Sequence, residues 1–266
     1  MKRRVPTTHR LDRNEDSPPE GPADPVGETA KETADVAAST EAYSRRFSGR
    51  VGAWMLGVQS ATLLAMLLDL SDSSVLDVGG GHAQVSPMLD DMGYSTHTVV
   101  SRSEATERLI RMGISGQKIR VGDLMDLPFA DRSFGAVVSV RMMAHVQDLP
   151  GYVGELCRVA DRAVVVDYTC MQGLGRAGTW LFSAKRALEG DTRRYTVSYR
   201  SEISELFEKN GFMIDQHVGQ FALPLVLHRK LRVTYISRAL EFVLRPLASR
   251  FGNPVLLRAT RRDETS

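Results

Sequence analysis

The sequence lacks two features that would mark a secreted protein, numerous cysteines and an apolar leader. Its 266 residues include only two cysteines, Cys157 and Cys170, so it has no disulfide framework, and a reducing, cytoplasmic compartment is predicted. The basic start after Met1 leads into no apolar segment, which argues against a secretory signal. We also expect no helix that crosses a bilayer, because no run is judged long and apolar enough.

Charge of one sign is not in excess. The chain has 34 Lys and Arg against 32 Asp and Glu, a formal net charge of +2, so its overall charge predicts no nucleic-acid partner. No group of His, Cys, Asp and Glu has the spacing of metal ligands, so no metal site is predicted. The hydrophobic content of 42% can supply a full core, and the length suits one domain with additions.

The N-terminal segment differs in composition from the rest. Residues 1–38 combine prolines and many charges with few large apolar side chains. Such a segment cannot bury enough surface to offset the entropy lost on ordering. We therefore predict a disordered tail over 1–38 and a folded domain over 39–266.

The predicted domain is organised around one stretch, which reads Val-Leu-Asp-Val-Gly-Gly-Gly-His-Ala-Gln over 75–84. An apolar run meets Gly79, Gly80 and Gly81, and an amphipathic segment follows. This order predicts a strand, a tight turn and a helix, which is the opening unit of a nucleotide-binding α/β sheet. Glycine is needed where the backbone takes a positive φ or approaches a ligand closely, and the first N–H groups of the helix can bind that ligand.

The residue before the glycines indicates which ligand the turn binds. A carboxylate at Asp77 repels a pyrophosphate and suits a cationic ligand that carries an amine. The stretch resembles motif I of the class I S-adenosylmethionine-dependent methyltransferases, Asp/Glu-x-Gly-x-Gly-x-Gly, with Ala83 in place of the third glycine. It is similar in particular to the type-11 methyltransferase group. The resemblance implies that Asp77 and the three glycines bind S-adenosylmethionine.

The resemblance also implies an architecture. The family has a Rossmann-like α/β fold, with a seven-stranded, mostly parallel sheet, one antiparallel strand and helices on both faces. The alternation of strand-like and helix-like segments independently supports this class. Segments 169–199 and 219–252 are interpreted as insertions that form the substrate-binding cap.

Further cofactor contacts follow from the resemblance. The second predicted strand ends at Ser101, where the family has an acidic residue that accepts hydrogen bonds from the ribose hydroxyls. Ser101, or Glu104 nearby, is expected to take that place. The Gly-Asp-Leu segment after the third strand assigns Asp123 to the adenine amino group and Leu124 to the adenine ring. Asp123 could instead serve only a turn.

The ends of two later strands complete the predicted site. Arg141 and His145 follow the fourth strand, and Tyr168 ends the fifth strand next to Asp167. Open α/β sheets bind their ligands at the carboxyl ends of their strands. The resemblance assigns Arg141 to the cofactor and places His145 and Tyr168 as catalytic candidates, with His145 able to accept a proton. A histidine that only packs the loop is an equal alternative.

The C-terminal part contains a basic amphipathic segment over 229–251. We predict one long helix with Ile236, Leu240 and Leu247 along one side and several arginines elsewhere. A helix packed between the last two strands, with its arginines in solvent, is the simpler account. Peripheral contact with a membrane surface is the alternative.

The implied reaction is methyl transfer from S-adenosylmethionine to a small-molecule acceptor, at oxygen, carbon or nitrogen, by in-line displacement. The sequence lacks an Asn-Pro-Pro-Tyr-type motif, which would indicate nucleic-acid or protein amide substrates. A catalytically silent, methyltransferase-like binding protein remains an alternative. So does an NAD-dependent oxidoreductase, against which Asp77 argues.

Overall fold

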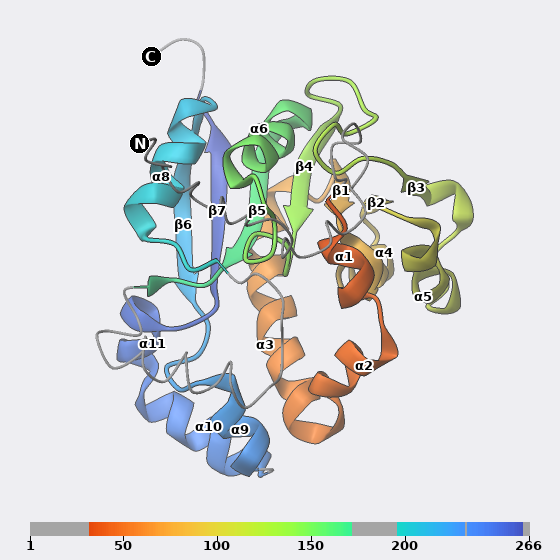
Figure 1. Ribbon diagram of the computed structural model, residues 1–266. Coiled ribbons are helices and arrows are strands. Elements are labelled where there is room, and N and C mark those ends of the chain that lie inside the picture. The colour runs from red at the N-terminus through yellow and green to blue at the C-terminus, as the bar shows by residue number, and fades with distance from the viewer. Residues whose placement is uncertain (1–31, 172–195, 232, 263–266) are drawn as a thin grey trace, which may run out of the picture. The chain divides into compact units, whose positions relative to one another are not determined.

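The computed structural model describes residues 32–171, 196–231 and 233–262. Its framework is a seven-stranded sheet with the order β3-β2-β1-β4-β5-β7-β6 (Figure 1). The strands are β1 (Ser74–Val78), β2 (Ser95–Val100), β3 (Ile119–Val121), β4 (Phe134–Ser139), β5 (Ala160–Tyr168), β6 (Phe212–Gly219) and β7 (Val255–Arg261). This is the order that places the predicted glycine turn at the centre of the sheet.

One strand is reversed relative to its neighbours. β1 pairs in parallel with β2 and β4, and β4 pairs in parallel with β5. β7 lies between β5 and β6 and is antiparallel to both. The predicted Rossmann-like sheet, mostly parallel with one antiparallel strand, is therefore confirmed.

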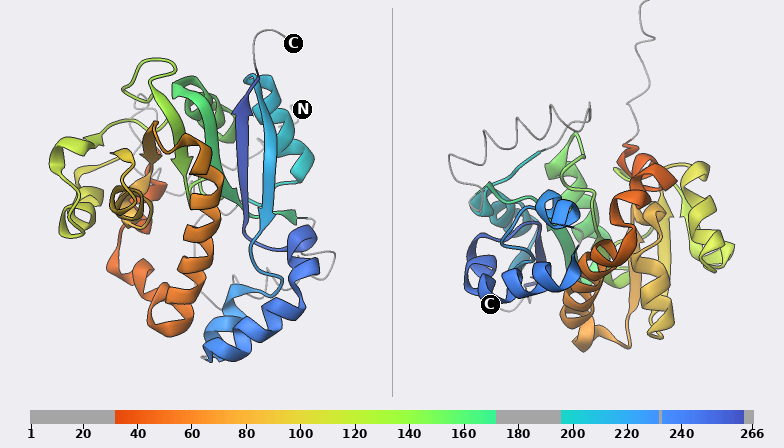
Figure 2. Two further views of the ribbon diagram at one scale, coloured as in Figure 1. Left: turned by 180° about the vertical axis from the view of Figure 1, so that it is seen from behind. Right: turned by 90° about the horizontal axis from the view of Figure 1, so that it is seen from below.

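Helices cover both faces of the sheet (Figures 1 and 2). α3 (Gly49–Leu67) and α4 (Val85–Asp91) pack on one face, and α6 (Leu149–Val159) and α8 (Arg200–Lys209) pack on the other. Strands buried on both faces are nearly continuous hydrophobic runs, as in β1 and β5. The remaining helices are α1 (Ala34–Ala38), α2 (Glu41–Ser44), α5 (Thr106–Arg111), α9 (Leu225–Leu231), α10 (Thr234–Val243) and α11 (Arg245–Phe251), with short 3-10 turns η1 (Arg45–Phe47), η2 (Leu68–Leu70), η3 (Gly80–His82), η4 (Ser103–Ala105) and η5 (Gly116–Lys118).

One helix meets the length and hydropathy criteria for a membrane span, so the expectation that no stretch does so is wrong. α3 and η2 together cover Gly49–Leu70, 22 residues with a mean hydropathy of 1.7. In the structure, Leu63 and Met66 pack against the sheet. Gln59 donates a hydrogen bond to Asp167 in the interior. The core helix of an α/β domain has the same composition, because it buries a wide apolar face.

The ordered part of the chain starts earlier than the sequence predicted. The tail was placed over 1–38, but residues 34–38 form α1, whose Asp35 is fully buried. The last residues of the predicted tail are therefore part of the fold, because a tertiary contact orders a segment whose own composition does not. Residues 1–31 lie outside the described part of the chain.

The structure describes one of the two predicted cap insertions, and most of the other lies outside the described residues. The segment 219–252 forms α9, α10 and α11 rather than one long helix, and Pro246 stands in the first turn of α11. These three helices lie beyond the carboxyl ends of the parallel strands, at the same end of the domain as α2 (Figures 1 and 2). Residues 172–195, which make up most of the predicted insertion 169–199, lie outside the described residues.

Gly135, the second residue of β4, has no space for a side chain. A Cβ added at Gly135 would lie 2.3 Å from the Cβ of Ser73. The register of β4 against β5 also shifts between Phe134 and Ala136. Any side chain at this position would collide with the turn before β1.

We expect Gly135→Ala to lower the free energy of unfolding by about 1–3 kcal/mol, because the added methyl group overpacks this contact. Urea unfolding followed by circular dichroism measures the change. The double variant Gly135→Ala with Ser73→Gly should recover most of the loss, because it removes the opposing Cβ. A double variant no more stable than Gly135→Ala alone would contradict the explanation.

Candidate functional site

The glycine turn begins where β1 ends and requires glycine at its first position. Gly79 has a φ of +74°, a conformation that L side chains rarely adopt. A Cβ there would lie 2.6 Å from the sulfur of Met142. The chain continues through η3 to Ala83, which also has a positive φ of 54°, and α4 starts at Val85. The strand–turn–helix unit predicted from the sequence is therefore present.

Asp77 lies beneath this turn and is fully buried. One of its carboxylate oxygens accepts hydrogen bonds from the Ser86 amide N–H at 3.2 Å and the Ser86 hydroxyl at 2.7 Å. A Cβ on Gly80 would lie 2.2 Å from the same oxygen, so the turn is in direct contact with the carboxylate. The other oxygen, Oδ1, is buried without a partner. Burial raises the pKa of Asp77 to about 6, and the bonds from Ser86 oppose that rise.

His82 is a member of the turn that the sequence analysis did not single out. Its ring is buried, and Nδ1 accepts a hydrogen bond from the amide N–H of Gln84 at 3.2 Å. Nε2 is buried without a partner. Burial, together with the nearby charge of Arg141, lowers the pKa of His82 to about 3, so the ring is neutral. A histidine next to a glycine turn has no local signal that would reveal this burial.

The end of β2 carries a carboxylate, but it comes from another part of the chain. The Ser101 amide N–H donates to Asp35 Oδ2 at 2.7 Å, and the Ser101 hydroxyl donates to Asp35 Oδ1 at 2.5 Å. Glu32 accepts from the Gln147 amide N–H at 3.0 Å, in the loop after β4. Burial raises the pKa of Asp35. The segment that begins α1 thus contacts two of the loops predicted to bind the cofactor.

Arg141 is the centre of a buried polar network next to the turn. Its amide N–H donates to Asp167 Oδ1 at 2.5 Å, and its guanidinium donates to the side-chain oxygens of Gln59, at 3.0 Å, and Gln84. The guanidinium also lies over the ring of Phe47, 4.3 Å from its centroid. Burial lowers the pKa of Arg141. The network joins the ends of β4 and β5 to α3 and to the start of α4.

The two residues predicted to hold adenine occupy different environments. Asp123 Oδ1 accepts from the amide N–H of Met125 at 2.9 Å, which is the turn role considered as the alternative. Leu124 is fully buried in the core cluster that also contains Met142. A direct contact between Asp123 and adenine stays a prediction.

The two predicted catalytic residues differ in their surroundings. His145 is half-buried, and its amide N–H donates to the Met142 carbonyl at 2.8 Å. Tyr168 is buried on the face of β5 opposite Asp167, with its hydroxyl 2.7 Å from His217 Nε2. Burial raises the pKa of Tyr168, so the phenol stays protonated near neutral pH and cannot act as a base there. Their catalytic roles stay predictions.

An aromatic cluster lies between α3 and α9. The ring centroids of Trp54 and Phe221 are 5.4 Å apart, and those of Trp54 and His228 are 5.3 Å apart, in edge-on geometry. His228 is fully buried, and its Nε2 lies 2.8 Å from Glu241 Oε1. His228 Nδ1 is buried without a partner. The cap therefore places the His228–Glu241 pair next to the apolar side chains of Trp54 and Phe221.

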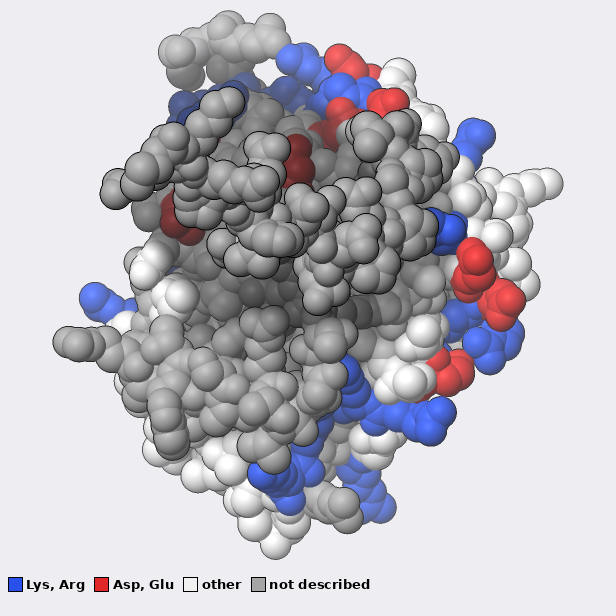
Figure 3. Space-filling view, viewed as in Figure 1, with Lys and Arg blue, Asp and Glu red and all other residues white. Residues whose placement is uncertain are grey.

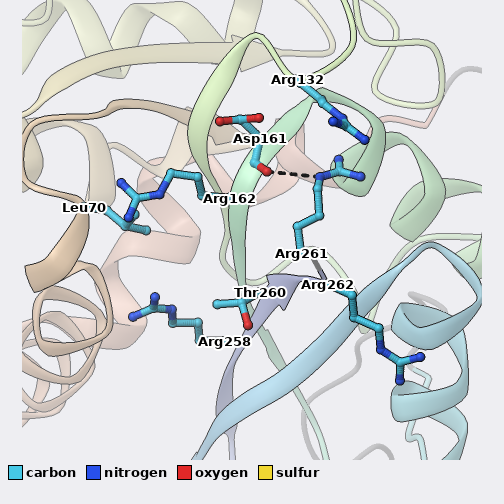
Figure 4. A pocket seen from close by; sticks show the side chains of 8 residues that line it. All are labelled: Leu70, Arg132, Asp161, Arg162, Arg258, Thr260, Arg261 and Arg262. Atoms are coloured by element: carbon cyan, nitrogen blue, oxygen red, sulfur yellow. Dashed lines mark hydrogen bonds between the residues drawn. The ribbon is translucent and has the colours of Figure 1, made fainter. Parts of the chain in front are cut away.

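A hollow of about 460 Å³ lies at the opposite end of the strands, where β5 starts and β7 ends (Figure 4). Two of the arginines that line it are engaged in the fold. Arg258 donates two bonds to the carboxylate of Asp69 at 2.7 and 2.6 Å. Arg261 donates to the backbone carbonyls of Asp161 and Cys157 at 3.0 and 2.8 Å. These contacts fix β7 against its neighbours, and the glycine turn lies at the opposite end of the strands.

Over the ranges that the structure describes, no group of three or more His, Cys, Asp or Glu could hold a metal ion.

The family comparison covers the central part of this geometry. Residues 76–163 match the family model described as a methyltransferase domain. The match covers about a third of the chain and agrees with the resemblance to S-adenosylmethionine-dependent methyltransferases noted from the sequence. The matched range runs from β1 into β5 and so includes the glycine turn, Ser101, Asp123, Arg141 and His145.

Individual proteins resemble this chain to different extents. A sterol 24-C-methyltransferase (erg-4) of Neurospora crassa is 36% identical over 94 residues, which are 33% of this chain and only 25% of that protein. A structure of geranyl diphosphate methyltransferase in complex with GPP and sinefungin has a TM-score of 0.59 and 21% identity, covering 87% of this chain and 88% of that one. A magnesium protoporphyrin IX methyltransferase from Synechocystis with bound SAH has a TM-score of 0.58 and 14% identity, covering 83% and 93%. At these identities the two structures show a shared fold.

We expect the turn histidine to make the protein acid-sensitive. The pKa of His82 is about 3 when folded and 6.5 as a model value, so the unfolded chain binds more protons between these limits. Stability from this group is therefore fully present above pH 6.5 and is lost as pH falls. Between pH 7 and pH 5, wild type should lose about 2 kcal/mol more than His82→Asn, as measured by urea unfolding. Equal losses in both proteins would contradict a buried, neutral His82.

Proposed function

We propose that this protein transfers a methyl group from S-adenosylmethionine to a small molecule with a large apolar part. The observation that carries the proposal is the buried carboxylate of Asp77 in contact with a turn that has no room for a Cβ at Gly79 or Gly80. A backbone this bare permits a close approach by a ligand. A negative charge beneath it favours a cationic ligand over a diphosphate.

The residues around the turn fit the methionine part of S-adenosylmethionine. Asp77 Oδ1 is a buried polar atom without a partner, so the carboxylate beneath the turn has unused hydrogen-bonding capacity. Arg141 offers a guanidinium that donates hydrogen bonds to the neutral side-chain amides of Gln59 and Gln84. We assign Arg141 to the α-carboxylate of the methionine part, because a guanidinium matches the geometry of a carboxylate.

The ribose position is supported by Asp35 rather than by a residue of β2. In Rossmann-like folds, an acidic residue about 20 residues after the glycine turn binds a ribose hydroxyl. Ser101 stands at that place, and Asp35 supplies the carboxylate through two hydrogen bonds from Ser101. We propose that Asp35 accepts hydrogen bonds from the ribose diol, since each carboxylate oxygen can accept more than one. Ser101 then positions Asp35.

The methyl-transfer step depends more on the orientation of the reactants than on acid–base catalysis. S-adenosylmethionine, when bound, supplies a methyl group on a positively charged sulfur that leaves as a neutral thioether. The chain's own contribution is to hold the acceptor in line with that methyl group and to exclude water, and Phe47 and Trp54 provide apolar surface at the cofactor end of the sheet. Where the acceptor atom must lose a proton, His145 is the proposed base.

The proposed acceptor class rests on the lining of the cap. Val51, Met55 and Phe221 form a buried apolar cluster against which Trp54 packs, so an acceptor bound next to this cluster would meet apolar side chains. The names of the three similar proteins refer to a sterol, to geranyl diphosphate and to a protoporphyrin, all of them small molecules. A mainly apolar acceptor therefore agrees with both the cap and the relatives.

Substitutions in the turn test cofactor binding. Calorimetry with S-adenosylhomocysteine should show no binding by Gly79→Val, because both φ and Met142 oppose a side chain there. Asp77→Asn should bind about 10- to 100-fold more weakly, because it keeps the shape and removes the charge. Gly116→Ala, at a glycine with open space around it, should bind like wild type.

Unchanged affinity in both turn variants, with unchanged circular dichroism, would refute this placement of the cofactor. Binding without any transfer to a panel of apolar acceptors would instead favour the silent, methyltransferase-like binding protein.

The role of Asp35 can be isolated with a modified ligand. Wild type should bind the 2′-deoxy analogue of S-adenosylhomocysteine about 10-fold more weakly than the parent, because a hydrogen bond to a charged group is lost. Asp35→Asn should bind the parent weakly and discriminate little between the two ligands. Glu104→Gln, the neighbouring acid considered from the sequence, should keep the full discrimination. Tighter binding of the parent by Asp35→Asn would show that α1 covers the ribose site instead of completing it.

A further inference from the structure

Helices α10 and α11 expose a stripe of large apolar side chains. Tyr235, Phe242 and Val243 have 75%, 76% and 73% of their surfaces accessible. The stripe also contains further exposed side chains: Ile236, Leu240, Leu247 and Phe251. Soluble proteins rarely leave contiguous apolar groups of this size in water unless the surface binds something. We call these seven side chains the apolar stripe.

The residues that these helices bury are small. Ser237 is fully buried in α10, and Ala248 is the buried residue of α11. The helices therefore pack on the domain through small side chains and point their large apolar ones outward. This differs from the simpler account drawn from the sequence, in which the hydrophobic side of the helix packs between the last two strands. The elements that the structure describes leave the apolar stripe exposed.

The charges beside the apolar stripe are of one sign. Arg238, Arg245 and Arg250 are exposed on the same two helices. The only acidic residue between positions 225 and 251 is Glu241. Its carboxylate is mostly buried and accepts hydrogen bonds from the backbone of Ala222 and Leu223. The surface is thus apolar and basic, without an outward carboxylate to balance the arginines.

We propose that α10 and α11 dock on an anionic lipid surface, with the apolar stripe entering the headgroup region and the arginines pairing with lipid phosphates. Helices with large apolar groups flanked by basic ones bind in this way, and each basic side chain adds electrostatic attraction. A second copy of this chain fits less well. A twofold interface through the same patch would set its arginines against each other, and like charges repel.

The position of the stripe connects it with the rest of the domain. α9–α11 lie at the end where the parallel strands finish, which is also where the glycine turn lies (Figures 1 and 2). Among the residues that Figure 3 colours at the lower end of the molecule, basic and uncharged side chains are seen. The inference is independent of the proposed function, because lipid binding is measured without cofactor or acceptor.

Co-sedimentation with vesicles tests the docking. The full chain should pellet with phosphatidylcholine vesicles that contain phosphatidylglycerol and much less with phosphatidylcholine alone. Tyr235→Ser with Phe242→Ser and Val243→Ser should abolish pelleting on both. The triple variant Arg238→Gln with Arg245→Gln and Arg250→Gln should lose roughly fivefold in affinity per arginine, only on the anionic vesicles. Raising the salt concentration should mimic the arginine variant.

A matched control uses exposed apolar residues elsewhere. Met92→Ser with Ile110→Ser and Met112→Ser removes three side chains of similar exposure near α4 and α5, and should leave vesicle binding unchanged. Circular dichroism and unfolding confirm that each variant folds. The proposal is overturned if wild type does not bind anionic vesicles, or if the serine variant binds them like wild type. It is also overturned if gel filtration shows that wild type is a dimer and that, among the variants, only the serine variant of the apolar stripe is a monomer. The stripe would then be covered by a second copy of the chain.

Discussion

The bond between the buried carboxylate of Asp77 and Ser86 is the constraint on which the cofactor end of the domain depends. Asp77 is the next-to-last residue of β1, and Ser86 lies in the first turn of α4, where backbone N–H groups have no partner within the helix. The Ser86 hydroxyl also lies 2.6 Å from the Thr98 hydroxyl on β2. Two strands and a helix are thus joined beneath the glycine turn. The turn must pass directly over a carboxylate, which is why it has no space for side chains.

The buried charged groups near the glycine turn are stabilised by hydrogen bonds from neighbouring residues. Asp77, Asp35 and Asp167 are all carboxylates whose pKa values are raised by burial, and each is partly compensated by hydrogen bonds. Arg141 supplies the buried positive charge, and Asp167 and two glutamines hold it in place. Such a concentration of buried charge is costly for stability alone. It is typical of a site that is organised before its ligand binds.

The parts added to the common sheet explain the individual features of this chain. α1 brings Asp35 to Ser101, so the absence of an acidic residue at the end of β2 does not leave that position without a carboxylate. Ser73 occupies the space that a side chain at Gly135 would need. The cap helices turn their large apolar residues outward, which sets them apart from helices that only cover a core. The changes at Ser101 and Gly135 therefore each have a neighbouring residue that accounts for them.

The fold and the centre of the site followed from local sequence, because hydrophobic runs, glycines and caps act between near neighbours. The strand, the glycine turn and the helix that follows belong to this part, whereas the single antiparallel strand was expected from the family resemblance. Tertiary structure alone decided that Asp35 meets Ser101 across 66 positions, that Asp77 points under the turn, and that Tyr168 faces away from Asp167. It also decided which side of α10 faces outward. The periodicity of a helix shows that it has an apolar side, whereas only the surrounding packing determines whether that side is buried.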